Sequence, residues 1–203
     1  MTKAVVLAAP NGALPDPLMA WADERSRLGH DHWDELWDGV LHMVPPPSYG
    51  HNDRGTQLLV FLHPIAASAG LKATYEAGVF RPGRSDDYRQ PDLLIARPEH
   101  ISHRGVEGRA ELVVEIRSPH DEAWEKLPFF AEMGIPEVLI LDADRAVLLR
   151  LGRDVTEAGA TSVYREVLPD RFGALALEVL PIHITNLGSG RFRVSSATGS
   201  LEI

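Results

Sequence analysis

The stretch that decides the fold is ELVVEIRSPHDEAWEKLPFF, residues 111–130. Its first part reads as a buried strand, because apolar residues dominate it and a Ser-Pro pair then ends it. Side chains alternate between the two faces of a strand, so Leu112 and Ile116 are expected on one face, and Glu115 and Arg117 on the other. Two charged side chains therefore face the same way at the end of an apolar element.

The charge of Glu115 has more than one interpretation. It could form an ordinary strand-end ion pair with Arg117. However, Asp92 opens the preceding apolar strand, DLLIA, and adjacent strands would bring the two carboxylates together. Like charges at close range persist with a shared proton or a bound cation, and Mg²⁺ accepts one or two carboxylates. The alternative for Asp92 is a turn-forming role after proline, and Glu111 is expected to face solvent at the start of its strand.

Lys126 follows the strand after the Ser-Pro break. The segment DEAWEKLPFFAEMG, residues 121–134, predicts a helix that ends at Gly134 and has Pro128 in or near its first turn. A lysine early in this helix can reach back over the strand end. The alternative is a solvated helix lysine.

Helix and strand signals alternate along the rest of the chain. Helices are expected over residues 18–29 and 51–69, where Leu58, Leu62 and Ile65 recur at helical spacing. Asp38-Gly39 is a turn signal before a strand-like VLHMV. Short strands follow the main helix, two strands surround an Asp-Ala-Asp turn after residue 136, and further strands form the C-terminal part.

Composition limits the classes of protein to consider. The chain has 203 residues, no cysteine and a net charge of −9. One domain is expected at this length. The absence of cysteine fits a reducing compartment, and KAVVLAAP near the start is too short for a secretory or membrane-spanning segment, so a cytoplasmic protein without a membrane partner is expected. The negative charge disfavours indiscriminate coating of nucleic acid, although an enzyme with metal-binding carboxylates stays compatible with it.

Several motifs occur in a recognisable order. QPDLLIA, ELVVEIRSP and then a lysine before MGIPEVLILD follow ELWDGVLHMVPPP and His51. This order resembles the Uma-type family of restriction endonucleases, within the PD-(D/E)XK nuclease superfamily, over roughly residues 33–151. The resemblance implies an α/β fold with a restriction-endonuclease-like core, in which helices flank a mixed central β-sheet. We expect a flexible arm over residues 1–17, the core over 18–151 and a C-terminal antiparallel strand meander over 152–203 as an extension of the same domain.

The resemblance also implies roles for individual residues. Asp92 and Glu115 would bind the metal, Mg²⁺ or Mn²⁺, and Lys126 would be the catalytic lysine, displaced from the strand into the helix. Glu35 would complete the metal shell or orient a water molecule. His51 is a further candidate for the substrate pocket.

Arginines supply the remaining candidates. Arg117 stands where the simplest form of the superfamily motif has lysine, and its high pKa excludes a role as a base, although it could hold a phosphate. Arg81, Arg84 and Arg89 lie in loops that flank the acids and would bind phosphate groups, as would Arg104 and Arg109. The alternative for these loop arginines is a solvated surface, since Asp residues are interleaved with them.

The expected function is metal-dependent hydrolysis of phosphodiester bonds by an endonuclease, with DNA as the substrate. Double-strand cleavage often needs two sites, so a homodimer through the C-terminal strands is a further expectation. The alternative is a catalytically inactive binding or assembly module on a nuclease-derived fold. In that case Glu115 and Arg117 would form a structural ion pair.

Overall fold

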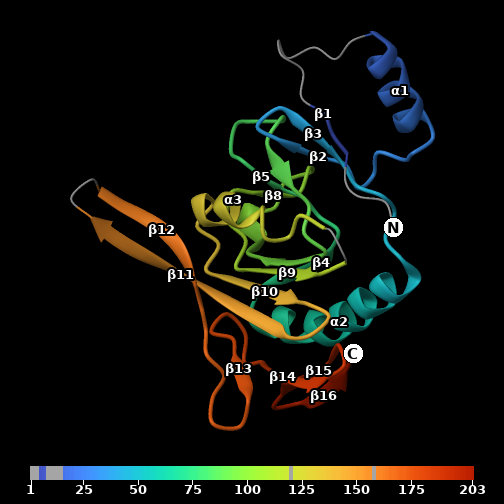
Figure 1. Cartoon of the computed structure of the whole chain (residues 1–203). Helices are drawn as coiled ribbons and strands as arrows, with labels where there is room; N and C mark the ends of the chain where they lie inside the picture. Colours follow the sequence, from blue (N-terminus) through green and yellow to red (C-terminus); the bar gives the residue numbers. More distant parts are fainter. Residues whose placement is uncertain (1–4, 8–15, 119–120, 157–158) are drawn as a thin grey trace.

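A mixed sheet of six strands forms the centre of the molecule (Figure 1). The computed structural model describes residues 5–7, 16–118, 121–156 and 159–203. The strands of the central sheet lie in the order β12 (Gly159–Glu166), β11 (Ala146–Thr156), β10 (Glu137–Leu141), β9 (Leu112–Ile116), β7 (Leu93–Ala96) and β4 (Lys72–Tyr75). β9 and β10 run parallel, and the other neighbours are antiparallel.

The central strands are covered on both faces. Every residue of β7, β9 and β10 is buried, as expected for near-continuous apolar runs. Along β9, Leu112, Val114 and Ile116 belong to one apolar cluster, whereas Val113 belongs to the other. The predicted alternation of faces is confirmed, and it places Glu115 on the same face as Val113.

The helix α2 (Tyr49–Ser68) covers one face of the sheet. Ser48 accepts a hydrogen bond from the backbone N–H of His51 at its start, and Gly70 has φ +74 just past its end. Leu58 and Leu62 point into the core, which follows from their spacing of one helical turn.

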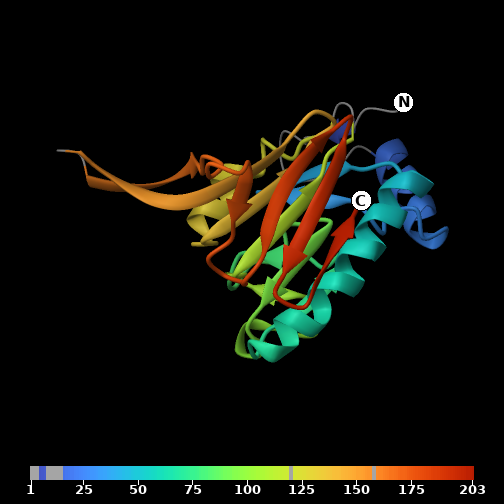
Figure 2. The same cartoon turned by 90° about the horizontal axis from the view of Figure 1, so that it is seen from below.

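A C-terminal antiparallel sheet lies alongside α2, as the view from below shows (Figure 2). Its strands are β13 (Ala174–Ala176), β14 (His183–Gly188), β15 (Arg191–Ser196) and β16 (Gly199–Glu202). Phe192 and Val194 of β15 pack into the same apolar cluster as α2. The predicted fold class, a mixed sheet flanked by helices with a C-terminal antiparallel meander, is confirmed.

The helix α3 (Leu127–Glu132) covers the opposite face and is shorter than predicted. Lys126 occupies its N-cap position, and residues 123–126 form a turn where the first helical turns were expected. Asp121 explains the late start of the helix. Its carboxylate accepts hydrogen bonds from the backbone N–H groups of Ser118 and Ala123, and these bonds compete with helical hydrogen bonds. Pro128 is placed in the first turn, where its missing N–H costs nothing.

A second sheet of short strands flanks the central one. Its order is β1 (Val5–Leu7), β3 (Val40–Met43), β2 (Glu35–Trp37), β6 (Tyr88–Arg89), β5 (Val79–Phe80) and β8 (Val106–Glu107). The turn between β2 and β3 has positive φ at Asp38 and Gly39, the pair of conformations that a tight type I′ hairpin requires. This hairpin holds Glu35 at the start of β2.

The remaining elements lie outside these layers. The helix α1 (Asp16–Arg27) precedes β2, and a 3-10 helix, η1 (Pro98–His100), follows β7. Most of the arm expected over residues 1–17 lies outside the described residues. The outer parts of β11 and β12 project from the body as a ribbon (Figure 1), and β11 runs across the boundary expected at residue 151.

One prediction about the strand β9 is wrong. Glu111 does not face the solvent: it is buried and its carboxylate accepts hydrogen bonds from Arg97 at 2.8 Å and Arg109 at 3.3 Å. Both arginines come from the connection between β7 and β9, so the charge of Glu111 is neutralised by contacts that strand periodicity does not reveal. Among the described residues, no helix is long and apolar enough to cross a membrane.

Candidate functional site

Asp92 and Glu115 stand opposite each other at the ends of two neighbouring strands. β7 and β9 pair antiparallel with Leu93 opposite Val114, and the next step of this register sets Asp92 opposite Glu115. The carboxylate of Asp92 also accepts a hydrogen bond from the backbone N–H of Ile116 at 2.5 Å. The two acids therefore approach each other because of strand pairing, independently of any loop.

The ammonium of Lys126 joins this pair from the turn before α3. Its Nζ atom lies 3.3 Å from Oε1 of Glu115 and 2.9 Å from Oε1 of Glu35. It also donates a hydrogen bond to the backbone carbonyl of Gln90 at 3.2 Å. The structure thus brings together Glu35, Glu115 and Lys126.

Glu35 is held by three donors from three different segments. Besides Lys126, the backbone N–H of Gln90 donates to Oε1 at 3.0 Å, and the indole N–H of Trp37 donates to Oε2 at 2.6 Å. Only 2% of Glu35 is exposed. A carboxylate so fully satisfied is fixed in orientation and acts as a rigid counter-charge for Lys126.

His51 contacts the other acid from α2. Its Nε2 lies 2.9 Å from Oδ1 of Asp92, and its Nδ1 lies 3.4 Å from the hydroxyl of Ser118. Burial alone would lower the pKa of His51, but the carboxylate of Asp92 outweighs this and raises it. The contact with Asp92 therefore stabilises the protonated form of the imidazole and holds the carboxylate of Asp92 in place.

The electrostatics of the cluster are dominated by burial and by an excess of negative charge. Glu115 is 4% exposed, and burial raises its pKa well above the ordinary value. The positive charge of Lys126 lowers this pKa, whereas the negative charges of Asp92 and Glu35 raise it further. Burial would lower the pKa of Lys126, but Glu115 and Glu35 raise it above its ordinary value. Three carboxylates against one ammonium favour a charged lysine and the uptake of a proton or cation near Glu115.

These residues line one cavity with a volume of about 400 Å³. Part of its wall is apolar, formed by Trp33, Val44, Pro45, Pro46, Pro47, Ile116 and Ala123. The polar part comprises Glu35, Ser48, His51, Glu76, Gln90, Asp92, Glu115, Ser118, Asp121, Glu122 and Lys126. A concave pocket with convergent charged groups and perturbed pKa values is the usual setting of an active site.

The donor set fits a hard divalent cation. Oε1 of Glu115 is buried and has no hydrogen-bond donor, apart from the ion pair with Lys126. Within the described parts of the chain, no three side chains of His, Asp or Glu converge on a common metal position. Mg²⁺ suits such a site, since it is commonly held by one or two carboxylates and completes its shell with water and substrate oxygens.

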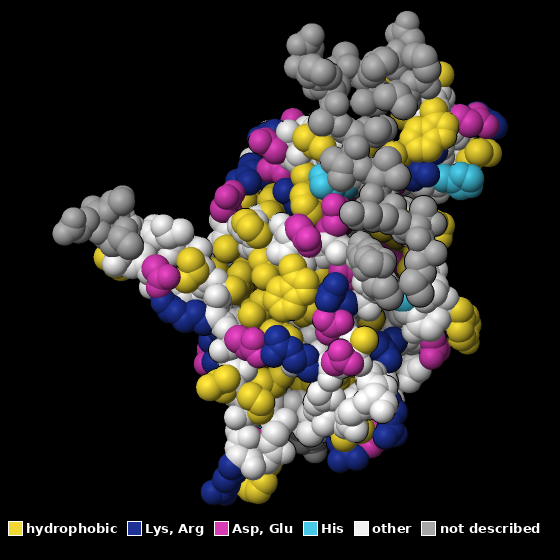
Figure 3. Space-filling view, viewed as in Figure 1, with side chains coloured by type: hydrophobic (Ala, Val, Ile, Leu, Met, Phe, Trp, Pro, Cys, Tyr) yellow, Lys and Arg dark blue, Asp and Glu magenta, His cyan; other side chains and the backbone are white. Residues whose placement is uncertain are grey.

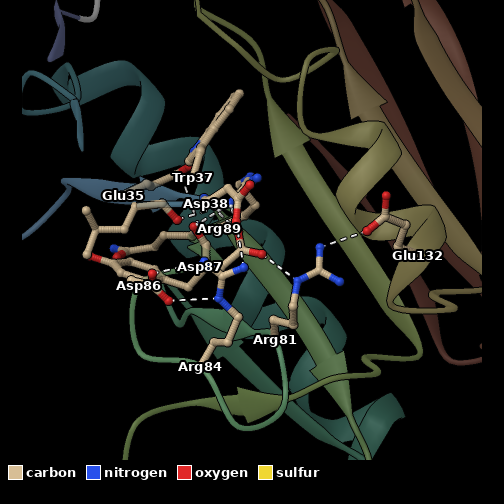
Figure 4. A network of polar contacts seen from close by, with 12 residues as sticks. Glu35, Trp37, Asp38, Arg81, Arg84, Asp86, Asp87, Arg89 and Glu132 are labelled. Carbon is tan, nitrogen blue, oxygen red and sulfur yellow. Dashed lines mark hydrogen bonds and ion pairs between the residues drawn. The ribbon is translucent and has the colours of Figure 1, made fainter. Parts of the chain in front are cut away.

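The arginines expected to bind phosphate do not line this cavity. Arg81 pairs with Asp87 at 2.5 Å and with Glu132 at 2.7 Å, and Arg84 pairs with Asp86 and Asp38 (Figure 4). Their substrate role stays a prediction. In this structure Arg81 links its loop to α3, and Arg84 links the same loop to the turn between β2 and β3.

Arg89 and Arg117 are likewise paired. Arg89 is buried, contacts Asp87, and lies over the rings of Trp37 and Phe129 at 4.4 and 4.3 Å. Arg117 pairs with Asp142 at 2.5 Å. No ion pair joins Arg117 to Glu115 among the described residues, because Glu115 faces Lys126 instead.

Sequence reasoning missed Trp37, Gln90 and Trp33. Trp37 stands two residues after Glu35 in β2, so alternation puts both side chains on one face, and this spacing was the available signal. Gln90 precedes Pro91 and contributes its backbone N–H and carbonyl to the contacts of Glu35 and Lys126. Every residue has a backbone, so the sequence does not identify such a contribution. Trp33 lines the cavity from the segment between α1 and β2.

The fold and the cluster define an α/β protein with an acidic cavity and one buried lysine. The chain belongs to the family described as "Uma2: Putative restriction endonuclease", whose model matches residues 23–180. A solved structure from Anabaena variabilis, titled as a "putative nuclease belonging to DUF820", is 14% identical with a TM-score of 0.48, over 65% of this chain and 76% of its own. Comparison with curated proteins found no match.

Proposed function

We propose that this protein is a divalent-metal-dependent endonuclease that hydrolyses phosphodiester bonds in nucleic acid, with DNA as the substrate. The observation that carries the proposal is the convergence of Lys126 with Glu35 and Glu115 in the cavity that Asp92 also lines. Membership of a restriction endonuclease family supports it. Asp92 and Glu115 would hold Mg²⁺ or Mn²⁺.

The reaction adds water to phosphorus and breaks the bond to the leaving oxygen, which takes up a proton. A divalent cation bound at such a site supplies a more acidic water and polarises the phosphate. The chain must then stabilise the negative charge that grows on the phosphoryl oxygens. Preorganised positive charge in a buried site is well suited to this.

Lys126 is the group that supplies this charge. Its raised pKa keeps the amine protonated at neutral pH, so it cannot accept a proton from water. Its role is electrostatic: the ammonium faces Glu115 and would donate to a phosphate oxygen placed beside it. Glu35 positions the ammonium, since its own orientation is fixed by Trp37 and Gln90.

His51 is assigned a positioning role. A protonated imidazole donates to Oδ1 of Asp92, while Oδ2 is held by the N–H of Ile116. The carboxylate therefore keeps one orientation toward Glu115. Supporting contacts of this kind commonly determine how well a ligand binds a metal.

The test is cleavage of plasmid, linear duplex and single-stranded DNA with Mg²⁺, Mn²⁺ or neither. Wild-type protein should cut in a metal-dependent manner, and Asp92→Ala should abolish cutting. Lys72→Met, at an exposed lysine outside the cavity, is the matched control and should cut like wild type. Intact substrates under all conditions, or an Asp92→Ala protein as active as wild type, would rule the nuclease out.

The second candidate function is an inactive binding or assembly module. It is favoured by the ion pairs that already satisfy Lys126 and by the lack of a convergent group of three metal ligands among the described residues. A module of this kind would gain no stability from divalent cations. An endonuclease that binds them only when folded must gain it.

A further inference from the structure

We propose that the cavity accepts an unpaired nucleotide, so that this enzyme cuts single strands, or nucleotides displaced from a duplex, in preference to intact double helix. The inference rests on the proposed nuclease function and adds the class of substrate. It follows from the depth of the acid–lysine cluster, the size and chemistry of the cavity wall, and the distribution of charge.

Depth restricts which substrates reach the cluster. Glu35, Glu115 and Lys126 are 2%, 4% and 9% exposed, so a phosphate that meets them must enter the cavity. The volume of about 400 Å³ is that of a small-ligand pocket. A nucleotide in a duplex is held in place by its pair and its stacked neighbours, whereas an unpaired nucleotide can enter by itself.

The wall of the cavity suits a nucleobase. Trp33 and the run Pro45–Pro47 contribute apolar surface to the lining. Aromatic side chains are common platforms for unpaired bases, because every base has a stacking face. The base would lie against this wall while its phosphate faces Lys126.

Two hydrogen-bond donors in the lining have no acceptor. Nε1 of Trp33 and Nε2 of Gln90 are both buried and unpartnered among the described residues. Buried N–H groups are nearly always paired in folded proteins. The Watson–Crick edge of a base carries carbonyl and ring-nitrogen acceptors that are occupied in a duplex, and in an unpaired base stacked on Trp33 they would accept from Nε2 of Gln90.

Charge also disfavours a duplex at the cavity. Six carboxylates line it, from Glu35, Glu76, Asp92, Glu115, Asp121 and Glu122, and Lys126 is the one lysine or arginine in the described lining. Figure 3 shows basic and acidic side chains interspersed on the face in view, with no continuous basic stripe over its described part. Duplex binding draws its affinity from many phosphate contacts with basic side chains. The carboxylates of this cavity repel phosphates, so they repel a ligand with few phosphates least.

The test compares three fluorescently labelled DNAs of one sequence, incubated with Mg²⁺: a single strand, a perfect duplex and a duplex with one bulged nucleotide. The single strand should be cut at least about ten-fold faster than the perfect duplex, and cuts in the third substrate should map to the bulge. A perfect duplex cut as fast as the single strand would overturn this inference and leave the nuclease function standing. If none of the three is cut, the nuclease function fails.

A binding measurement decides the inference even without cleavage. In Ca²⁺, anisotropy of a labelled oligothymidylate should report tighter binding than that of a labelled hairpin duplex, and equal affinity would overturn the proposal. Trp33→Ala should weaken single-strand binding about ten-fold, whereas Trp33→Phe, which keeps the stacking face, should lose less. Trp21→Ala, at an exposed tryptophan outside the cavity, is the control and should bind like wild type.

Discussion

The ammonium of Lys126 lies 2.9 Å from Oε1 of Glu35, and this contact joins the turn before α3 to the hairpin of the second sheet. The amine of Lys126 also reaches Glu115 at the end of β9, so under the proposed function it would take the role of the lysine that is absent at position 117. Glu35 thus determines where the positive charge of the site stands. Four predictions concern the residues around this pair, and a fifth concerns the C-terminal sheet.

Replacing Lys126 by methionine should slow cleavage even at a temperature where the variant is folded, although the loss of the counter-charge to buried Glu35 and Glu115 lowers its stability. Methionine retains most of the length and loses the charge, so the rate of a single turnover should fall by about 10²–10³, the usual cost of one preorganised electrostatic contact in a transition state. Quenched-flow cleavage with protein in excess measures this. Lys72→Met is the matched control, and equal rates for the two variants would show that Lys126 is not catalytic.

Replacing Trp37 by phenylalanine should lower both the stability of the protein and its cleavage rate, because Trp37 holds Glu35 in place. The ring keeps a face toward His42 and Arg89, but Oε2 of Glu35 loses its donor. A buried unpartnered carboxylate oxygen costs about 1–3 kcal/mol of unfolding free energy. Urea denaturation measures the stability, and the cleavage rate should fall several-fold with unchanged KM. Trp21→Phe should change neither quantity.

Replacing Glu115 by glutamine should stabilise the protein as pH rises. A carboxyl whose folded pKa is raised stabilises the fold fully below its unfolded value of about 4.5, and this contribution is lost as pH rises through the folded pKa. Glutamine cannot lose a proton, so the stability of the variant should match that of wild type near pH 4.5 and exceed it increasingly as pH rises through the folded pKa of Glu115. Urea denaturation at several pH values checks this. A constant difference across the range, or the same curve for the exposed Glu125→Gln, would contradict it.

Magnesium should stabilise the folded protein through Asp92 and Glu115. At a concentration 100 times the Kd, a ligand specific for the folded state adds about 2.7 kcal/mol, which corresponds to a rise of several degrees in Tm for a chain of this size. Scanning calorimetry with increasing Mg²⁺ measures it. Asp92→Asn should flatten the titration, and a flat titration of the wild type would favour the inactive module.

Replacing Glu137 by alanine should weaken the attachment of the C-terminal sheet. The carboxylate is 1% exposed and accepts hydrogen bonds from Arg150 and from the backbone N–H groups of Glu178 and Val179. Loss of these contacts should cost about 3 kcal/mol of unfolding free energy. The exposed pair of Glu166 with Arg145 is the control, since Glu166→Ala should cost under about 1 kcal/mol.

The parts of the fold that local patterns specify were predictable. Alternation placed Glu115 on the face away from Leu112, and helical spacing identified the buried residues of α2. The start of α3 was predicted too early, because side-chain hydrogen bonds of Asp121 form the turn that precedes it. The spacing of apolar residues predicts a helix but does not indicate that a local turn competes with its first residues.

The parts that depend on distant contacts were not predictable. Arg81 and Arg84 were expected to bind phosphate, yet after folding they pair with carboxylates far along the chain, Glu132 and Asp38. Glu111 is buried because two arginines converge on it. The charge of a residue in the sequence indicates neither its partner nor its exposure, since both are set by strands and loops that are far apart along the chain.

The antiparallel register of β7 and β9 also bears on how this site tolerates change in length. Leu93 and Val114 pair directly, and the connection after Ala96 lies on the far side of that pairing from the two acids. Residues could be inserted or deleted in that connection without separating Asp92 from Glu115. A single-residue slip within β9 would instead turn Glu115 to the opposite face and dismantle the cavity. Natural variation in length should therefore concentrate between the two strands, where it leaves the chemistry untouched.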